Sequence, residues 1–132
     1  MTLIFCIDEN RGIAFGGRRQ SRDRELCRDI MNDASGKALA MSAYSAKLFE
    51  DGNILISDTP QKEQDIYFLE LKKPDELIPL ADRVIIYNWN RLYPSDVKFD
   101  KEMSSYGFTL ATKQDIKGFS HEKITKEIYE KQ

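Results

Sequence analysis

The stretch from Thr2 to Asp33 constrains the fold most strongly, because it holds a strand pattern, a glycine-bearing loop and a helical pattern in that order. Residues 2–8 form a short apolar run with β-branched and aromatic members, which is typical of a buried strand. A loop that follows such a strand lies at its carboxyl end, where open α/β sheets tend to bind ligands. The opening therefore predicts where a site lies, and not what the site does.

The rest of the chain alternates between strand patterns and short helical patterns. This alternation predicts a single α/β domain over residues 1–132, with a mainly parallel sheet flanked by short helices. The first helix is expected after Ser21 as its N-cap, running to about Ala34 before the Ser35-Gly36 stop. The other expected strands are Ala38–Ser42, Asn53–Ser57, Ile66–Leu71, Arg83–Trp89 and Tyr106–Leu110. The other expected helices are Tyr44–Glu50 and Glu76–Leu80, and in the first of these Leu48 and Phe49 are expected to face inward.

One segment near the end of the chain is ambiguous. In Lys123–Tyr129, Ile124 and Ile128 have the four-residue spacing of a helix face, whereas the β-branched and aromatic residues favour a strand.

Composition narrows the function classes. The formal net charge of −2 gives no general attraction to nucleic acid or to a membrane surface. The chain has no apolar run of the ~20 residues that a membrane span needs and no signal-peptide pattern, so we expect a cytoplasmic protein. Its one histidine, His121, excludes a zinc or two-metal site built on several imidazoles. Cys6 and Cys27 fall on apolar faces, which favours buried thiols over a disulfide and disfavours thiolate catalysis.

Several segments, read in order, resemble dihydrofolate reductase. The family's opening pattern of small residue, x, Asp, x, Asn, x, x, Ile, Gly is matched by Cys6, Asp8, Asn10 and Ile13, with Ala14 in place of the glycine. Later segments are similar to the family's Met-Gly-Arg-x-Thr motif, its Asn-x-x-Leu-Ser-x-x-Pro strand, and its late strand with an Asp-x-x-Phe-Pro turn. They are Ala40–Phe49, Asn53–Pro60 and Val84–Asp100, the last with Asp96 and Phe99.

The resemblance implies a dihydrofolate reductase-like fold that ends in an antiparallel β-hairpin, which favours a strand for Lys123–Tyr129. It also implies that Asp23 lies near the family's pterin-binding carboxylate and Cys27 near its apolar pterin contact. The Leu-Pro-Trp segment that closes over the family's substrate is replaced by residues 19–21, Arg-Gln-Ser.

The cofactor site of the family is not preserved. Ala43 replaces the motif arginine at the cofactor phosphate, and Asp58 stands where a serine is usual. The strand and Gly-Gly turn that bind the pyrophosphate are missing between residues 71 and 82, and a glycine-rich helix start is how such folds hold a pyrophosphate. We therefore expect no cofactor and no reductase activity.

A second set of segments resembles a family of short bacterial proteins often labelled ribonuclease Z. The segments are Arg18–Arg24, Tyr44–Phe49, Trp89–Pro94 and Ser120–Lys126. Genuine ribonuclease Z enzymes are larger metallo-β-lactamase folds that bind two zinc ions through a His-x-His-x-Asp-His run. This chain has no such run, so we expect neither a metal site nor the labelled activity.

A basic cluster in the opening is the densest candidate site: Arg11, Arg18, Arg19, Arg22 and Arg24, around Gly16 and Gly17. Arginine forks bind phosphate or carboxylate bidentately, and a helix amino terminus adds backbone donors. The alternative is a solvated loop whose charges pair with neighbouring carboxylates. Arginines in a first helical turn oppose the helix dipole, which makes a binding role better supported than for an ordinary charged loop, while the solvated loop remains the competing interpretation.

Three other groups have weaker signals. Trp89, Arg91 and Tyr93 follow a strand and are of the residue types that dominate binding hot spots, although ordinary packing is an equal alternative. Asp23 is a weak candidate proton donor, and the competing interpretation is a helix-start carboxylate paired with an arginine. Ser120-His121-Glu122 has no partnered nucleophile by spacing, which favours a surface turn.

The sequence thus predicts a binding module without catalysis, which recognises an anionic small molecule or a protein partner through the arginine-rich loop. Nucleic acid and membrane are not expected partners. The alternative is a residual enzyme, either an NADPH-dependent reductase that uses Asp23 or a ribonuclease.

Overall fold

The computed structural model describes residues 1–49 and 53–132 and has a seven-stranded sheet, a three-stranded sheet and two α-helices in this part of the chain. In chain order the elements are β1 (Thr2–Ile7), β2 (Gly12–Phe15), β3 (Arg18–Arg19), α1 (Arg24–Ala34), β4 (Leu39–Met41), α2 (Ala43–Ala46), β5 (Ile54–Ile56), β6 (Ile66–Phe68), the 3₁₀ turn η1 (Ile78–Leu80), β7 (Arg83–Asn88), β8 (Val97–Lys98), the 3₁₀ turn η2 (Met103–Tyr106), β9 (Phe108–Ile116) and β10 (Ile124–Lys131).

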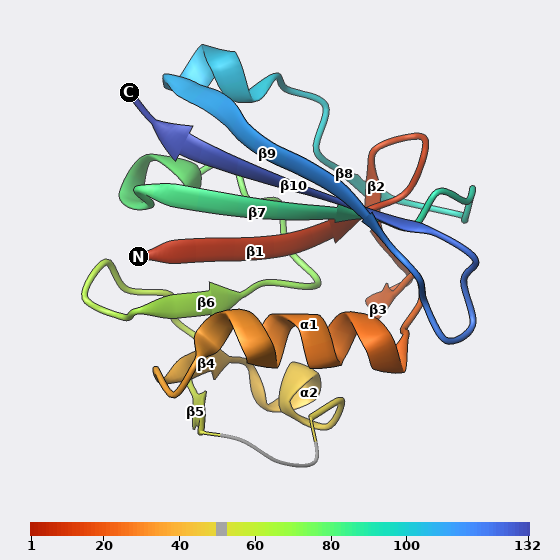
Figure 1. The fold of residues 1–132 in the computed structure, drawn as a ribbon, viewed down its shortest axis with the longest axis horizontal. Coiled ribbons are helices and arrows are strands. Elements are labelled where there is room, and N and C mark those ends of the chain that lie inside the picture. Colours follow the sequence, from red (N-terminus) through yellow and green to blue (C-terminus); the bar gives the residue numbers. More distant parts are fainter. Residues whose placement is uncertain (50–52) are drawn as a thin grey trace.

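The large sheet has the order β5-β4-β6-β1-β7-β10-β9 (Figure 1). Strands β5, β4, β6, β1 and β7 pair in parallel, so their carboxyl ends lie along one edge. Strand β10 pairs antiparallel with both β7 and β9. The predicted mainly parallel sheet and C-terminal antiparallel hairpin are therefore confirmed, and the ambiguous segment 123–129 is a strand.

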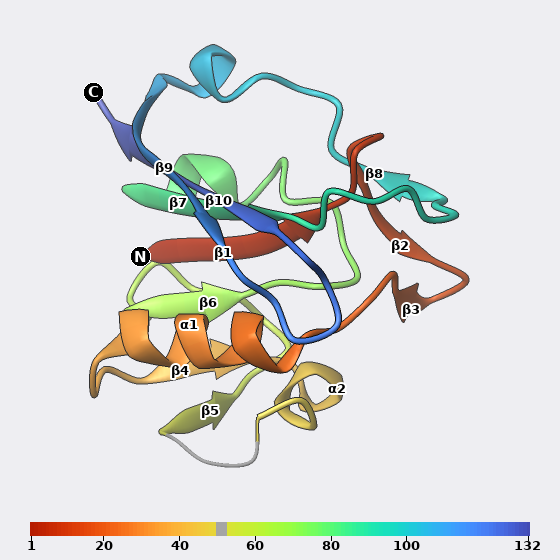
Figure 2. The ribbon, with the colours of Figure 1, turned by 45° about the vertical axis from the view of Figure 1, so that its right-hand side comes forward.

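Both faces of the central strands are buried, because consecutive side chains of a strand point to opposite faces. On one face Ile4 packs with Leu26 and Ile30 of α1, which runs alongside β6 (Figure 2). On the other face Leu3 and Phe5 pack with residues of η1, η2 and the segments around them. The strands at the centre of the sheet therefore read as continuous apolar runs.

Helix α1 is also fixed to the sheet by a buried cation. The Lys126 ammonium of β10 is almost fully buried and lies 2.8 Å from Asp29 Oδ2 and 2.6 Å from Asp33 Oδ2. The Tyr87 hydroxyl donates to Asp29 at 2.6 Å. Since a buried charge is tolerated only when it is paired, these contacts hold β10 and α1 in one relative position.

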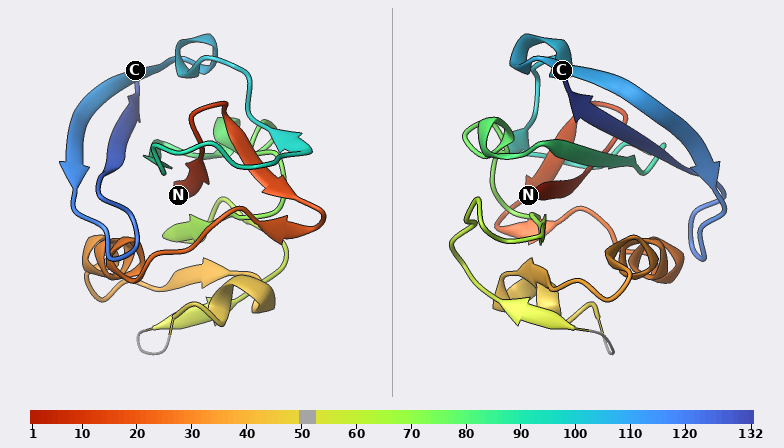
Figure 3. Two further views of the ribbon diagram at one scale, coloured as in Figure 1. Left: turned by 90° about the vertical axis from the view of Figure 1, so that its right-hand side faces the viewer. Right: turned by 60° about the vertical axis from the view of Figure 1, so that its left-hand side comes forward.

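Some local predictions were wrong. The glycine-bearing loop is partly a strand pair, β2 and β3, which joins β8 in a separate small sheet (Figure 3). Helix α1 begins at Arg24 with Asp23, not Ser21, as its N-cap. The expected helix over 76–80 is a single 3₁₀ turn, because Pro79 supplies no N–H. Strand β9 runs to Ile116, beyond the predicted end at Leu110.

The predicted helix over 44–50 is the short α2, followed by half-buried Leu48 and buried Phe49, and its last residue lies outside the described residues. The predicted Asp51-Gly52 stop lies outside them too. Among the helices described here, none is long and apolar enough to cross a membrane.

Candidate functional site

The loop after β1 is organised by Asp8, whose carboxylate is fully buried at the carboxyl end of the strand. It accepts hydrogen bonds from the backbone N–H groups of Asn10, Gly12 and Tyr93 and from the Gln20 side-chain amide. A buried carboxylate needs such donors to remain in place. Asp8 therefore fixes the loop, and its oxygens are occupied by these internal hydrogen bonds and not free for a ligand.

The cleft beyond β1 and β6 is filled by an ion pair that sequence reasoning did not predict. Arg19 donates from Nε to Glu70 Oε2 at 2.9 Å and from an Nη to Oε1 at 3.0 Å, and its guanidinium stacks on the Tyr44 ring. Ser45 Oγ donates to the same carboxylate at 2.7 Å. Burial alone would lower the pKa of Arg19, but the hydrogen bonds and charge of Glu70 raise it.

Little space remains beside this pair. The cavity lined by Arg19, Glu70, Cys6, Ser21 and Trp89, with Ile13, Gln20 and Leu69, has a volume of about 10 Å³. That volume is about one water molecule. The space beside this ion pair is thus closed by the chain's own side chains, while a pocket of about 330 Å³ remains at the carboxyl ends of β4 and β6.

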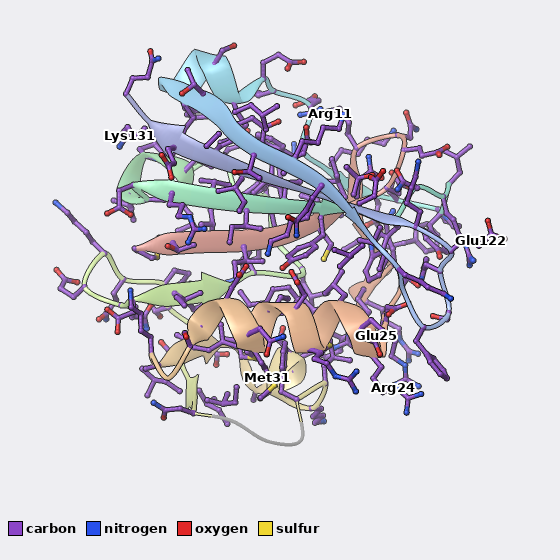
Figure 4. The ribbon with its side chains drawn as sticks, viewed as in Figure 1. Arg11, Arg24, Glu25, Met31, Glu122 and Lys131 are labelled. Atoms are coloured by element: carbon purple, nitrogen blue, oxygen red, sulfur yellow. The ribbon has the colours of Figure 1, made fainter. Side chains whose placement is uncertain are left out.

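The other predicted arginines do not form one cluster. Arg11 donates to the backbone carbonyls of Phe99 and Lys101 and lies far from Arg24 (Figure 4). Arg18 is exposed beside the turn formed by Gly16 and Gly17, which both have positive φ. Arg91 is exposed and donates to the Ser120 carbonyl.

The two remaining predicted arginines, Arg22 and Arg24, lie in a groove between α1 and the segment after α2. Arg22, Arg24, Arg28 and Lys47 line it, and its volume is about 780 Å³. Its apolar lining consists of Cys27, Met31, Leu48, Phe49 and Phe119. Figure 4 shows Arg24 at the amino end of α1 and Met31 farther along the helix.

The charges of this groove are unevenly neutralised. Arg28 pairs with Glu25 at 3.0 Å. Within the described ranges no carboxylate lies within 4.0 Å of the cationic nitrogens of Arg22 or Arg24. The Arg24 guanidinium instead lies 3.8 Å from the centroid of the exposed Phe119 ring.

Asp23 does not pair with an arginine, which corrects the sequence interpretation. Its buried carboxylate caps α1 through the Glu25 N–H and accepts from the N–H groups of Phe119, Ser120 and His121. Burial alone would raise the pKa of the Asp23 carboxyl, but hydrogen bonds from backbone N–H groups and the His121 side chain lower it well below its usual value. Asp23 is therefore a carboxylate that holds the β9–β10 loop on the start of α1.

Gly118 makes this close approach possible. A Cβ atom at Gly118 would lie 2.7 Å from Asp23 Oδ2 and 2.6 Å from the His121 carbonyl oxygen, so a larger residue does not fit.

His121 is not on a surface turn, as the sequence favoured, but is buried at 3 % exposure. Its Nδ1 lies 3.0 Å from Asp23 Oδ2, and its Nε2 lies 3.2 Å from Ser21 Oγ and 3.0 Å from the Tyr93 hydroxyl. The predicted hot-spot residue Trp89 is buried and stacks on the imidazole, with ring centroids 4.8 Å apart. No local pattern links these residues, since Ser21 and His121 lie 100 positions apart in the sequence.

The remaining site predictions concern cysteine, metal and cofactor chemistry. Both cysteines are free thiols, and burial raises the pKa of Cys27 to about 11, with a further contribution from the charge of Glu70. Burial likewise raises the pKa of Cys6. No group of metal-ligand residues suited to an ion occurs within 1–49 and 53–132. In those ranges η1 is the one regular element between β6 and β7, where the family's phosphate-binding turn would lie.

The fold matches a solved structure of dihydrofolate reductase from Enterococcus faecalis, complexed with NADP(H) and RAB-propyl. The TM-score is 0.69, the sequence identity is 11 %, and the match covers 98 % of this chain and 94 % of that chain. No protein-family model and no curated protein matches the sequence. The chain thus has a dihydrofolate reductase-like α/β fold, and at this identity the likeness concerns the fold alone.

Proposed function

We propose that this protein binds a small anionic molecule with an apolar or aromatic body in the groove between α1 and the segment after α2. The observation that carries the proposal is the pairing of Arg22 and Arg24 with an apolar lining in one concave surface. Its volume of about 780 Å³ lies within the ~300–1,000 Å³ range of small-molecule pockets. A protein partner would require a larger and flatter surface.

The chemistry of the groove divides the ligand into two parts. Arg22 and Arg24 present guanidinium forks, which suit carboxylate or phosphate oxygens. Met31, Leu48 and Phe119 offer apolar surface to the remainder of the ligand. The arginine-rich opening therefore contributes to binding through its helix-proximal members, whereas Arg11 and Arg19 are engaged in internal contacts.

Phenyl phosphate is a suitable probe because it joins an aromatic body to a phosphate group. Calorimetric titration should give tighter binding for phenyl phosphate than for inorganic phosphate, and none for benzyl alcohol. The affinity should fall as salt is raised, since exposed charges are screened. In a double variant, Arg22→Gln with Arg24→Gln, affinity should drop about tenfold or more, the size expected for losing charge-assisted hydrogen bonds.

Arg18→Gln is the matched control, because Arg18 is also exposed but lies on the β2–β3 hairpin outside the groove. This variant changes the net charge in the same direction and should bind phenyl phosphate like the unmodified protein. Equal losses in the control and in the groove variants would mean that overall charge, and not the groove, attracts the probe.

A residual reductase is the second candidate, favoured by the fold shared with a protein solved with NADP(H). Against it, Asp58 lines the pocket of about 330 Å³ beside β6, where its carboxylate would repel phosphate. We expect NADPH to bind no better than millimolar, about −4 kcal/mol. Trp89 borders the cleft, so saturating quenching of its fluorescence at low micromolar NADPH would support the reductase instead.

A further inference from the structure

The buried polar cluster around His121 has no part in the proposed anion binding. Its hydrogen bonds connect a carboxylate, an imidazole and a serine hydroxyl in the order found in serine hydrolases. Asp23 Oδ2 faces His121 Nδ1 at 3.0 Å, and His121 Nε2 faces Ser21 Oγ at 3.2 Å. Asp23 and His121 are each 3 % exposed, whereas Ser21 is half-buried and precedes a residue that lines the groove. The carboxylate and the base are thus shielded from water, whereas the serine is partly accessible.

The hydrogen bonds assign a direction to the cluster. Because Asp23 is held ionised by backbone donors, it accepts the proton of His121 Nδ1, which leaves Nε2 of the neutral ring as an acceptor. Two hydroxyls then face Nε2, that of Ser21 at 3.2 Å and that of Tyr93 at 3.0 Å, and the Tyr93 hydroxyl also lies 3.2 Å from Ser21 Oγ. Stacking on Trp89 fixes the plane of the imidazole.

We propose that Ser21, His121 and Asp23 form a nucleophilic relay that hydrolyses small carboxylic esters. The three roles follow the known logic of serine hydrolases, which is recognised by geometry and not by sequence position. Ser21 is the nucleophile, His121 the general base and Asp23 the positioning carboxylate.

The reaction balances without metal or cofactor. Ser21 Oγ forms a bond to the ester carbonyl carbon as its proton moves to His121 Nε2, and the alcohol leaves with that proton. Water then attacks the acyl-serine, loses a proton to Nε2 and releases the acid, and Ser21 Oγ takes the proton back. This activity does not depend on anion binding in the groove, whose lining includes neither Ser21 nor His121.

A merely structural role does not require this arrangement. The Asp23 carboxylate is already satisfied by the N–H groups of Glu25, Phe119 and Ser120, so the loop would be held without the imidazole. The side chain of His121 adds a link from that carboxylate to a hydroxyl on another segment, with Nε2 as a base. The proposed ester hydrolysis depends on that link.

A neutral fluorophosphonate reagent tests the relay directly, since Ser21 Oγ would displace fluoride from phosphorus and pass its proton to Nε2. Intact mass should show one phosphonyl group per chain, and peptide mapping should place it on Ser21. Ser21→Ala should abolish the adduct, and His121→Asn should slow labelling at least ~100-fold, the usual size of general-base catalysis. His121→Asn is chosen because the Asn amide can still donate to Asp23 from the position of Nδ1.

Ser104→Ala is the control, because Ser104 is an exposed serine on η2 outside the cluster. This variant should be labelled on Ser21 at the rate of the unmodified protein. Circular dichroism checks that each variant is folded, and the unmodified protein gives a second readout through hydrolysis of p-nitrophenyl acetate. Loss of labelling in both relay variants, together with ester turnover, supports the proposal. Labelling no faster than that of a free serine peptide, or labelling that persists in Ser21→Ala, overturns it, whatever the outcome for phenyl phosphate binding.

Discussion

Replacing Asp23 with alanine should destabilise the protein strongly, because this one buried carboxylate satisfies several donors. The change removes the N-cap of α1, which is worth about 1 kcal/mol. It also leaves the buried N–H and Nδ1 of His121 without their acceptor, at about 1–3 kcal/mol for each unsatisfied buried group.

The Phe119 and Ser120 N–H groups are partly exposed and would recover hydrogen bonds to water. Counting the cap and the two buried His121 groups gives a loss of roughly 4 kcal/mol in the free energy of unfolding. For a chain of this size that corresponds to a fall of roughly 15 °C in melting temperature. Asp23→Asn keeps one acceptor oxygen and should cost less than the alanine change.

Urea unfolding followed by the fluorescence of buried Trp89 measures the loss, with circular dichroism as an independent probe. Asp100→Ala is the control, because Asp100 is exposed, and it should change the free energy by no more than ~0.5 kcal/mol. A loss below ~1 kcal/mol for Asp23→Ala would refute the reasoning, because water or a rearranged loop would then satisfy the donors as well as the carboxylate does.

Further predictions concern the ion pair, acid stability and metal. Arg19→Gln should cost about 3 kcal/mol by leaving the Glu70 carboxylate without its cation, while Arg18→Gln should be neutral, and equal melting temperatures would contradict the buried pairing. The folded pKa of Asp23 lies below its unfolded value, so its contribution is complete above about pH 4 and is lost as the pH falls further. Unfolding midpoints should therefore decline below pH 4, and decline less steeply in Asp23→Asn; parallel curves would refute the assignment. The purified protein should carry no stoichiometric zinc and should not cleave a transfer-RNA precursor, and elemental analysis together with chelator-sensitive cleavage would show otherwise.

Local sequence patterns identified the strands of the central sheet and the order of elements. The apolar runs at 2–8 and 83–89 became β1 and β7 because buried parallel strands need apolar residues on both faces. The 123–129 segment was undecided by its own residues, and β10 is a strand because it pairs with β7 and β9. The intrinsic strand propensity of these residues is weak, so pairing with neighbouring strands decides their secondary structure.

The site was less accessible to sequence reasoning. The sequence identified a region rich in arginine, but charge clustering along a chain says little about which carboxylate a side chain will meet. Arg19 meets Glu70 across 51 positions, whereas Arg22 and Arg24 meet no carboxylate in the described ranges. Only the folded backbone separates an internal ion pair from a binding surface.

The sequence by itself determined that this chain has one histidine, two cysteines and a strand–loop–helix opening. These features limit the metal-binding and catalytic groups that the protein can form. The tertiary structure alone decided that Asp23, His121 and Ser21 meet, since the β9–β10 hairpin carries residues 118–121 back to the start of α1. The physical reason is that hydrogen bonds act over about 3 Å in space and leave no periodic trace along the sequence.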